Sequence, residues 1–177
     1  MKIDVISQSD KQAVGKEIAM IKVMFVCLGN ICRSPMAEMI FREMVRKTGA
    51  EKDFYIASSA TSTEELGHPI YSPARRELES HGIPCGEKRA VQLKKEDYDR
   101  YDFLLGMDSA NLSNMERITK HTRNEKMRLL LSFTKEGGSI ADPWYYGNFD
   151  RTYSDIVKGC RAFLEYLGYD ISQLKME

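Results

Sequence analysis

The chain has 177 residues, of which 42% are hydrophobic, and this is enough for one domain with its own core. Lys and Arg together number 26, as do Asp and Glu, so the formal net charge is zero. A balanced charge argues against a protein that binds nucleic acid or a membrane surface, because such proteins normally carry a basic excess. The longest apolar stretch, residues 21–28, is interrupted by Lys22 and is far too short to span a bilayer.

The four cysteines, Cys27, Cys32, Cys85 and Cys160, are scattered through a chain of ordinary domain size. This spacing is not that of a disulfide framework, and residues 1–20 lack the continuous apolar segment of a signal peptide. We therefore expect a cytoplasmic protein with mostly free thiols. The cysteines show no paired C-x-x-C spacing and the three histidines do not cluster with them, so no metal is expected, and no other cofactor.

The first nineteen residues are polar and only weakly periodic, so we expect an N-terminal extension of uncertain order over 1–19 and the domain over 20–177. The first predicted element is a strand at 21–27. Val23 and Phe25 in this run are too apolar for a solvent-facing edge, which favours a buried strand.

A helix is expected immediately after the first strand. Ser34 and Pro35 suit its start, because a proline in the first turn loses no useful N–H. Apolar residues continue with helical spacing to about Arg46, and Gly49 offers a stop. The segment from Val23 to Arg46 is therefore predicted to be a strand, a short loop and a helix.

The rest of the chain continues to alternate short apolar strands with amphipathic helices. Strands are expected at 54–57, 103–107 and 127–131, with a Ser/Thr-rich turn at 58–63. Helices are expected at 73–80, from residue 108, and at 150–167, the last with the apolar stripe Ile156, Cys160, Phe163, Leu164 and Leu167. This alternation predicts a single three-layer α/β domain: a central, mostly four-stranded parallel sheet flanked by helices on both faces, as in Rossmann-like and flavodoxin-like folds. Such folds bind ligands at the carboxyl ends of their strands, where Cys27 falls.

The loop between the first strand and the first helix has the parts of an anion site. Its backbone N–H groups and the positive end of the helix dipole would attract a phosphate, and Arg33 adds a charged planar fork. A cysteine at the start of such a loop, Cys27, is expected to be a thiolate at neutral pH and a nucleophile toward phosphorus. The spacing Cys-x5-Arg is moderately specific, and a disulfide between Cys27 and Cys32 remains an alternative use of the loop.

The loop sequence VCLGNICRSPMAE, residues 26–38, resembles the signature loop of the low-molecular-weight protein tyrosine phosphatases nearly residue for residue. The resemblance continues through SSATS at 58–62, HGIP at 81–84, LLGMDSANL at 104–112 and ADPWYYGNF at 141–149. It covers about residues 20–167, and the order of loop first and Asp-Pro far downstream also fits this family.

The resemblance implies catalytic roles for Cys27 as nucleophile, Arg33 as the phosphate-binding and charge-stabilising cation, and Asp142 as general acid and then base. Leu28, Gly29, Asn30, Ile31, Cys32 and Ser34 would bind the phosphate through the loop, and Trp144 and Tyr145 would wall the cleft. Asn30 and Ser34 would also support the loop, together with Ser58. Cys32 would form a reversible disulfide with the nucleophile under oxidation. One departure is Lys88, which stands where the family often has a histidine and to which we assign no role.

The expected function is that of a phosphotyrosine phosphatase acting on a protein or a small aryl phosphate, with no nucleic acid or membrane partner and an open oligomeric state. Protein-arginine phosphatases are the alternative, but they typically carry threonine where this chain has Ile31, and an apolar Ile31 favours an aromatic substrate. Thioredoxin-coupled arsenate reductases need further relay cysteines that this chain lacks near Cys85. A non-catalytic phosphate-binding module would need neither Cys27 nor Asp142.

Overall fold

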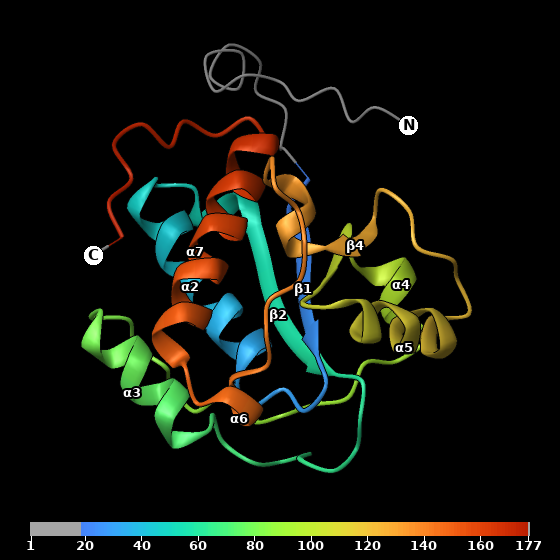
Figure 1. Cartoon of the computed structure of the whole chain (residues 1–177). Coiled ribbons are helices and arrows are strands. Elements are labelled where there is room, and N and C mark those ends of the chain that lie inside the picture. Colours follow the sequence, from blue (N-terminus) through green and yellow to red (C-terminus); the bar gives the residue numbers. More distant parts are fainter. Residues whose placement is uncertain (1–18, 177) are drawn as a thin grey trace.

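The structure, a computed structural model, describes residues 19–176 (Figure 1). The extension expected over residues 1–19 lies, except for Ala19, outside these described residues. Among residues 19–176, no helix is both long enough and apolar enough to cross a membrane.

The centre of the fold is a sheet of four parallel strands in the order β2-β1-β3-β4. The strands are β1 (Ile21–Cys27), β2 (Phe54–Ala60), β3 (Phe103–Gly106) and β4 (Met127–Leu129). Val23 of β1 pairs with Ile56 on one side and with Phe103 on the other. This interior position of β1 explains why its middle reads as a continuous apolar run.

The two faces of the sheet are covered by different helices (Figure 1). Successive side chains of a strand point to opposite faces, so Val23 and Phe25 belong to the larger core cluster, beneath α2 (Arg33–Lys47) and α7 (Phe149–Tyr166). Met24 and Val26 belong to a second cluster beneath α5 (Ser109–Thr119). The predicted three-layer arrangement with a four-stranded parallel sheet is confirmed.

The apolar stripe predicted on the last helix forms the centre of the larger cluster. Ile156, Cys160, Phe163 and Leu164 are completely buried, and each large aliphatic or aromatic side chain of this kind stabilises the fold by about 1.5–3 kcal/mol. Gly159 brings α7 against the turn η2 (Leu130–Phe133), since a Cβ on this residue would lie 2.6 Å from Cγ of Leu130.

Most predicted elements agree with the structure to within one or two residues. The exception is β2, which was expected to end at residue 57 but continues to Ala60, because Ser58 and Ser59 still pair with Phe25 and Val26 of β1. The predicted turn therefore begins only at residue 61. The remaining elements are α3 (Ser72–Ser80), the short helices α4 (Asp97–Arg100) and α6 (Pro143–Tyr146), and the 3-10 turn η1 (Glu51–Asp53). Of these only α3 was predicted.

Candidate active site

The loop between β1 and α2 lies at the carboxyl edge of the sheet, with Cys27 as the last residue of β1 and Arg33 as the first of α2. The buried Sγ of Cys27 lies 3.0 Å from Oγ of Ser34 and accepts the N–H of Asn30 at 3.3 Å. No side chain within residues 19–176 caps the start of α2, so its first N–H groups are free to bind an anion. The loop thus places a sulfur and an anion site at the same point.

Asn30 holds the loop in shape. Its φ of 57° is left-handed, a conformation that asparagine tolerates better than most other residues. The buried amide donates through Nδ2 to Oγ of Ser34 at 2.8 Å and to Oγ of Ser58 at 2.9 Å, and Oδ1 accepts the N–H of Val91 at 3.1 Å. The predicted supporting residues Asn30, Ser34 and Ser58 are therefore brought together, and they lie behind the loop with their side chains bonded to one another.

A buried ion pair continues this network below Ser58. The hydroxyl of Ser58 donates to Oε2 of Glu38, while Nζ of Lys88 donates to the carbonyl oxygen of Ser58 at 3.0 Å and lies 3.8 Å from the same Glu38 oxygen. Burial lowers the pKa of Lys88, although the neighbouring Glu38 carboxylate opposes that shift. Glu38 is also bound by Arg42 at 2.9 Å. Lys88, to which we assigned no role from the sequence alone, thus belongs to the support of the loop.

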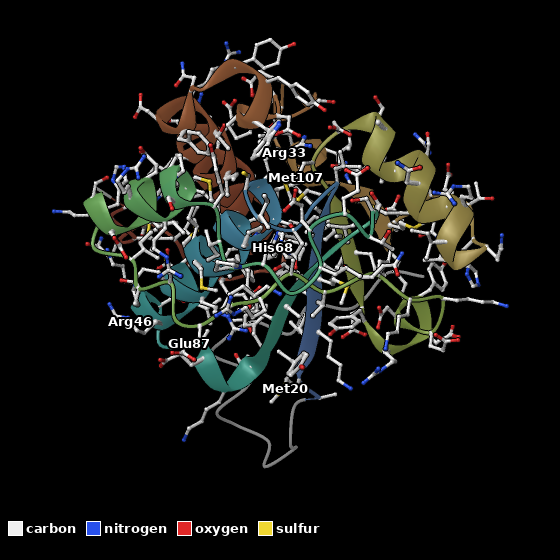
Figure 2. All side chains as sticks on the ribbon, turned by 90° about the horizontal axis from the view of Figure 1, so that it is seen from below. Met20, Arg33, Arg46, His68, Glu87 and Met107 are labelled. Carbon is white, nitrogen blue, oxygen red and sulfur yellow. The ribbon has the colours of Figure 1, made fainter. Side chains whose placement is uncertain are left out.

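Arg33 is the largest fully buried side chain of the molecule's described part, with 2% of its side chain exposed. Its Nη1 donates to Asp108 Oδ2 at 2.6 Å and to the carbonyl oxygen of Ile140 at 2.9 Å, and its Nη2 donates to Asp142 Oδ2 at 3.0 Å. Burial alone would lower the pKa of Arg33, but the charges of Cys27, Asp108 and Asp142 outweigh it and hold that pKa above its usual value. In Figure 2, which views the molecule from this end, Arg33 lies among the loops near the start of α2.

Asp142 is fixed at both carboxylate oxygens. It is the N-cap residue of α6, and its Oδ1 accepts the N–H of Trp144 at 3.1 Å while Oδ2 accepts from Arg33. Pro143 occupies the first helical position, where its missing N–H costs nothing. Although 109 residues separate Arg33 from Asp142, the fold brings them into one ion pair beside Cys27.

A cavity of about 140 Å³ opens above these groups. Of the residues singled out from the sequence, it is lined by Cys27, Leu28, Gly29, Ile31, Cys32, Arg33, Asp142, Trp144 and Tyr145. The aromatic side chains form an exposed wall: 53% of Trp144 and 71% of Tyr145 are exposed, and the Trp144 ring lies 4.9 Å from that of Tyr71. The cavity is therefore polar and enclosed at the bottom and aromatic at the mouth.

Cys32 lines the cavity as a neutral thiol. Burial, followed by the negative charges of Cys27 and Asp142, raises its pKa far above the ordinary value. All four cysteines are free in this structure. Among residues 19–176, no group of three or more His, Cys, Asp and Glu side chains is placed to hold a metal ion.

Several site residues were not identified from the sequence. Asp108 lies two residues after the end of β3, at the same edge of the sheet as Cys27, and that position is the signal that would have indicated it. The carbonyl of Ile140 and the Glu38 carboxylate give no such signal, because only the fold brings them to Arg33 and Ser58. Three further residues line the cavity, Ser62, Glu64 and Glu65.

The comparisons with known proteins agree with one another. The sequence model described as "Low molecular weight phosphotyrosine protein phosphatase" matches residues 22–173. A human protein of that name is 39% identical over 148 residues, which is 81% of this chain and 93% of the human one.

Solved structures of similar proteins show the same fold. The crystal structure of YfkJ from Bacillus subtilis superposes with a TM-score of 0.81 at 32% identity and covers 89% of this chain and 98% of its own. An arginine phosphatase from drosophila superposes with a TM-score of 0.76 at 30% identity, covering 85% of this chain and 99% of its own.

Proposed function

The chain belongs to the low molecular weight phosphotyrosine protein phosphatase family, and from this premise we propose that it hydrolyses phosphotyrosine in proteins, or small aryl phosphates, through a phosphocysteine on Cys27. The single observation that carries this proposal is that one cavity holds the Cys27 sulfur, the Arg33 guanidinium and the Asp142 carboxylate. A protein that only bound phosphate would need neither the sulfur nor the carboxylate.

In the first step, the phosphoryl oxygens bind to Arg33 and to the free N–H groups of the loop and of the start of α2. They replace the Asp142 carboxylate as the partner of Nη2, so Asp142 is free to face the leaving oxygen. Cys27 Sγ forms a bond to phosphorus as the bond from phosphorus to the phenolic oxygen breaks, and protonated Asp142 gives its proton to that oxygen.

In the second step, the Asp142 carboxylate takes a proton from a water molecule as the water oxygen attacks phosphorus. The bond between phosphorus and sulfur breaks, and the thiolate and inorganic phosphate are the products. Ser34 Oγ and the N–H of Asn30 lie close to Sγ, where they stabilise the departing thiolate by hydrogen bonds. The same carboxyl group thus serves as acid and then as base.

The alternative substrate is phosphoarginine, which is favoured by the likeness to the drosophila arginine phosphatase. Against it, the side chains of Ile31, Trp144 and Tyr145 all line the cavity. Apolar contact with Ile31 and stacking on the two aromatic rings suit a phenyl ring. We therefore place phosphotyrosine first.

Phosphopeptides of one sequence that carry phosphotyrosine, phosphoarginine or phosphoserine test this proposal. We expect phosphate release from the phosphotyrosine peptide with the highest kcat/KM and none by the Cys27→Ser variant. A higher kcat/KM for phosphoarginine would replace the proposed substrate, and equal activity of the Cys27→Ser variant would remove the covalent mechanism.

Two further properties belong to the same proposal. We place the enzyme in the cytoplasm, because its cysteines are not arranged as a disulfide framework. The two steps proposed above use only protein groups and water, so we expect the enzyme to act without a metal or cofactor. Cys32 lines the same cavity as Cys27, and we propose that mild peroxide oxidises Cys27 to a sulfenic acid that Cys32 converts to a disulfide with loss of water. Peptide mapping after such treatment should find a Cys27–Cys32 disulfide that a reductant removes, whereas a lasting sulfenic acid on Cys27 would contradict this.

A further inference from the structure

One wall of the cavity is acidic, although the substrate's phosphoryl group is an anion. Ser62, Glu64 and Glu65, the acidic wall, line the cavity beside Cys27 and Gly29. We propose that the acidic wall binds the cationic side chain of an arginine or lysine that flanks the phosphotyrosine in a protein substrate. This inference rests on the proposed phosphotyrosine phosphatase activity and adds the sequence around the substrate tyrosine.

The acidic wall is held at a fixed position relative to the phosphate-binding loop. Beyond the end of β2, the N–H of Thr61 donates to the carbonyl oxygen of Cys27 at 2.9 Å, and the N–H of Ser62 donates to that of Leu28 at 2.9 Å. These two bonds extend the pairing of β1 and β2 into the loop itself. A group bound at the acidic wall therefore lies at a set distance from a phosphoryl group bound by the loop.

Gly29 lets Glu65 approach the loop closely. A Cβ on this glycine would lie 3.3 Å from Cγ of Glu65, tighter than ordinary van der Waals contact. The backbone of Gly29 does not adopt a positive φ, so close approach rather than conformation is the local reason for a glycine here. The Glu65 carboxylate is thus kept near the loop instead of extending into solvent.

The polar groups of the acidic wall have capacity for a cationic ligand. Within residues 19–176, the buried Oγ of Ser62 has no hydrogen-bond partner, and no ion pair engages the exposed Glu64. Glu65 is 31% exposed, and its Oε2 lies 2.7 Å from Nδ1 of His68. The wall therefore presents two carboxylates to solvent, and within residues 19–176 the Glu64 carboxylate is engaged in no ion pair.

The phosphoryl group does not account for the acidic wall. Arg33 and the loop N–H groups provide the positive charge at the bottom of the cavity, and Trp144 and Tyr145 provide the surface for the phenol ring on another side. Two carboxylates at the mouth would repel an acidic residue next to the phosphotyrosine and attract a basic one. Because these carboxylates are exposed, salt should weaken the effect.

Phosphotyrosine peptides that differ only in the residues beside the phosphotyrosine test the proposal. One set carries arginine on either side, one alanine and one glutamate. At low ionic strength we expect kcat/KM for the arginine peptides to exceed that for the glutamate peptides by roughly tenfold, the effect of two exposed charge pairs. Raising the salt concentration should shrink this ratio.

The double variant Glu64→Gln/Glu65→Gln should bring the ratio of arginine to glutamate peptides close to one. The matched control Glu136→Gln/Glu165→Gln removes two exposed carboxylates that do not line the cavity and should keep the ratio of the unmodified protein. The ratio is internal to each variant, so a general loss of stability or of catalysis would lower both rates and leave it unchanged.

Each outcome separates this inference from the proposed activity. Equal rates on all the phosphotyrosine peptides, a preference for glutamate, or an unchanged ratio in the Glu64→Gln/Glu65→Gln variant would overturn the inference and leave the phosphatase activity intact. Hydrolysis of a phosphoarginine peptide with no hydrolysis of any phosphotyrosine peptide would overturn the proposed function instead.

Discussion

The bottom and the mouth of the cavity are built in opposite ways. At the bottom, Asn30, Arg33 and Ser34 are buried, and each of their side chains is bonded to groups from distant segments of the chain. At the mouth, Glu64 and Tyr145 are exposed, and they are placed mainly by the backbone that carries them. The fold therefore fixes the groups at the bottom of the cavity, whereas residues at the mouth can change and alter the substrate preference without disturbing those groups.

Replacing the nucleophile should have the largest effect. Cys27→Ser keeps the size of the side chain but loses the thiolate, so kcat on an aryl phosphate should fall by at least about 10³-fold. Circular dichroism should show an unchanged fold. A variant that retained activity within tenfold of the unmodified protein would mean that the bottom of the cavity does not act as described.

Asp142→Asn should slow the reaction by roughly 10²–10⁴-fold for substrates with poor leaving groups, the usual contribution of a general acid. Asparagine can still accept the N–H of Trp144 and cap α6, so the position of the aromatic wall should be preserved. Aryl phosphates that span a range of leaving-group pKa values measure the effect. An equal loss for good and poor leaving groups would exclude Asp142 as the acid.

The support beneath the loop should show an intermediate effect. Lys88→Met removes the donor to the carbonyl oxygen of Ser58 and leaves Glu38 with Arg42 as its remaining cationic partner. We expect the free energy of unfolding to fall by about 1–3 kcal/mol and kcat to fall more than KM rises, because the Ser58–Asn30 contacts hold the loop.

A double variant tests whether Lys88 and Glu38 act as a pair. Lys88→Met leaves the Glu38 carboxylate with one cationic partner fewer, and adding Glu38→Gln removes that carboxylate. The combined loss of stability should therefore be smaller than the sum of the single losses. Denaturant unfolding of the four proteins gives this coupling. Strictly additive losses would show that the ion pair contributes nothing to the support.

The mouth should give the smallest effect. Trp144→Ala removes a half-exposed ring that packs against Tyr71, so KM for aryl phosphates should rise by a few-fold while kcat hardly changes. Steady-state kinetics on one aryl phosphate and one alkyl phosphate measure it. A large fall in kcat with both substrates would show that the mouth is coupled to the chemistry, contrary to the comparison above.

How far the sequence predicted this site depends on whether a residue's role is local. The roles proposed for Cys27 and Arg33 rest on a strand, a loop and a helix that are contiguous in the chain, and the stripe of α7 follows from its periodicity. Lys88 and Glu38 are 50 positions apart and meet only through the packing of the fold. From the sequence alone, a charged residue at either position is therefore expected to be exposed to solvent. The end of β2 was predicted wrongly for the same reason. Consecutive serines in a sequence indicate a turn, and only the pairing with β1 shows that Ser58 and Ser59 belong to the strand.

In the proposed mechanism the phosphoryl group is transferred to Cys27 before water releases it as inorganic phosphate. Rapid mixing with an aryl phosphate, acid quenching and peptide mapping by mass spectrometry measure this directly. We expect one phosphoryl group on the peptide that contains Cys27 within the first turnover. The Asp142→Asn variant should accumulate more of this phosphorylated peptide when the leaving group is good, because that variant lacks the base for the second step. Hydrolysis with no phosphorylated cysteine at any time in the first turnover would contradict it.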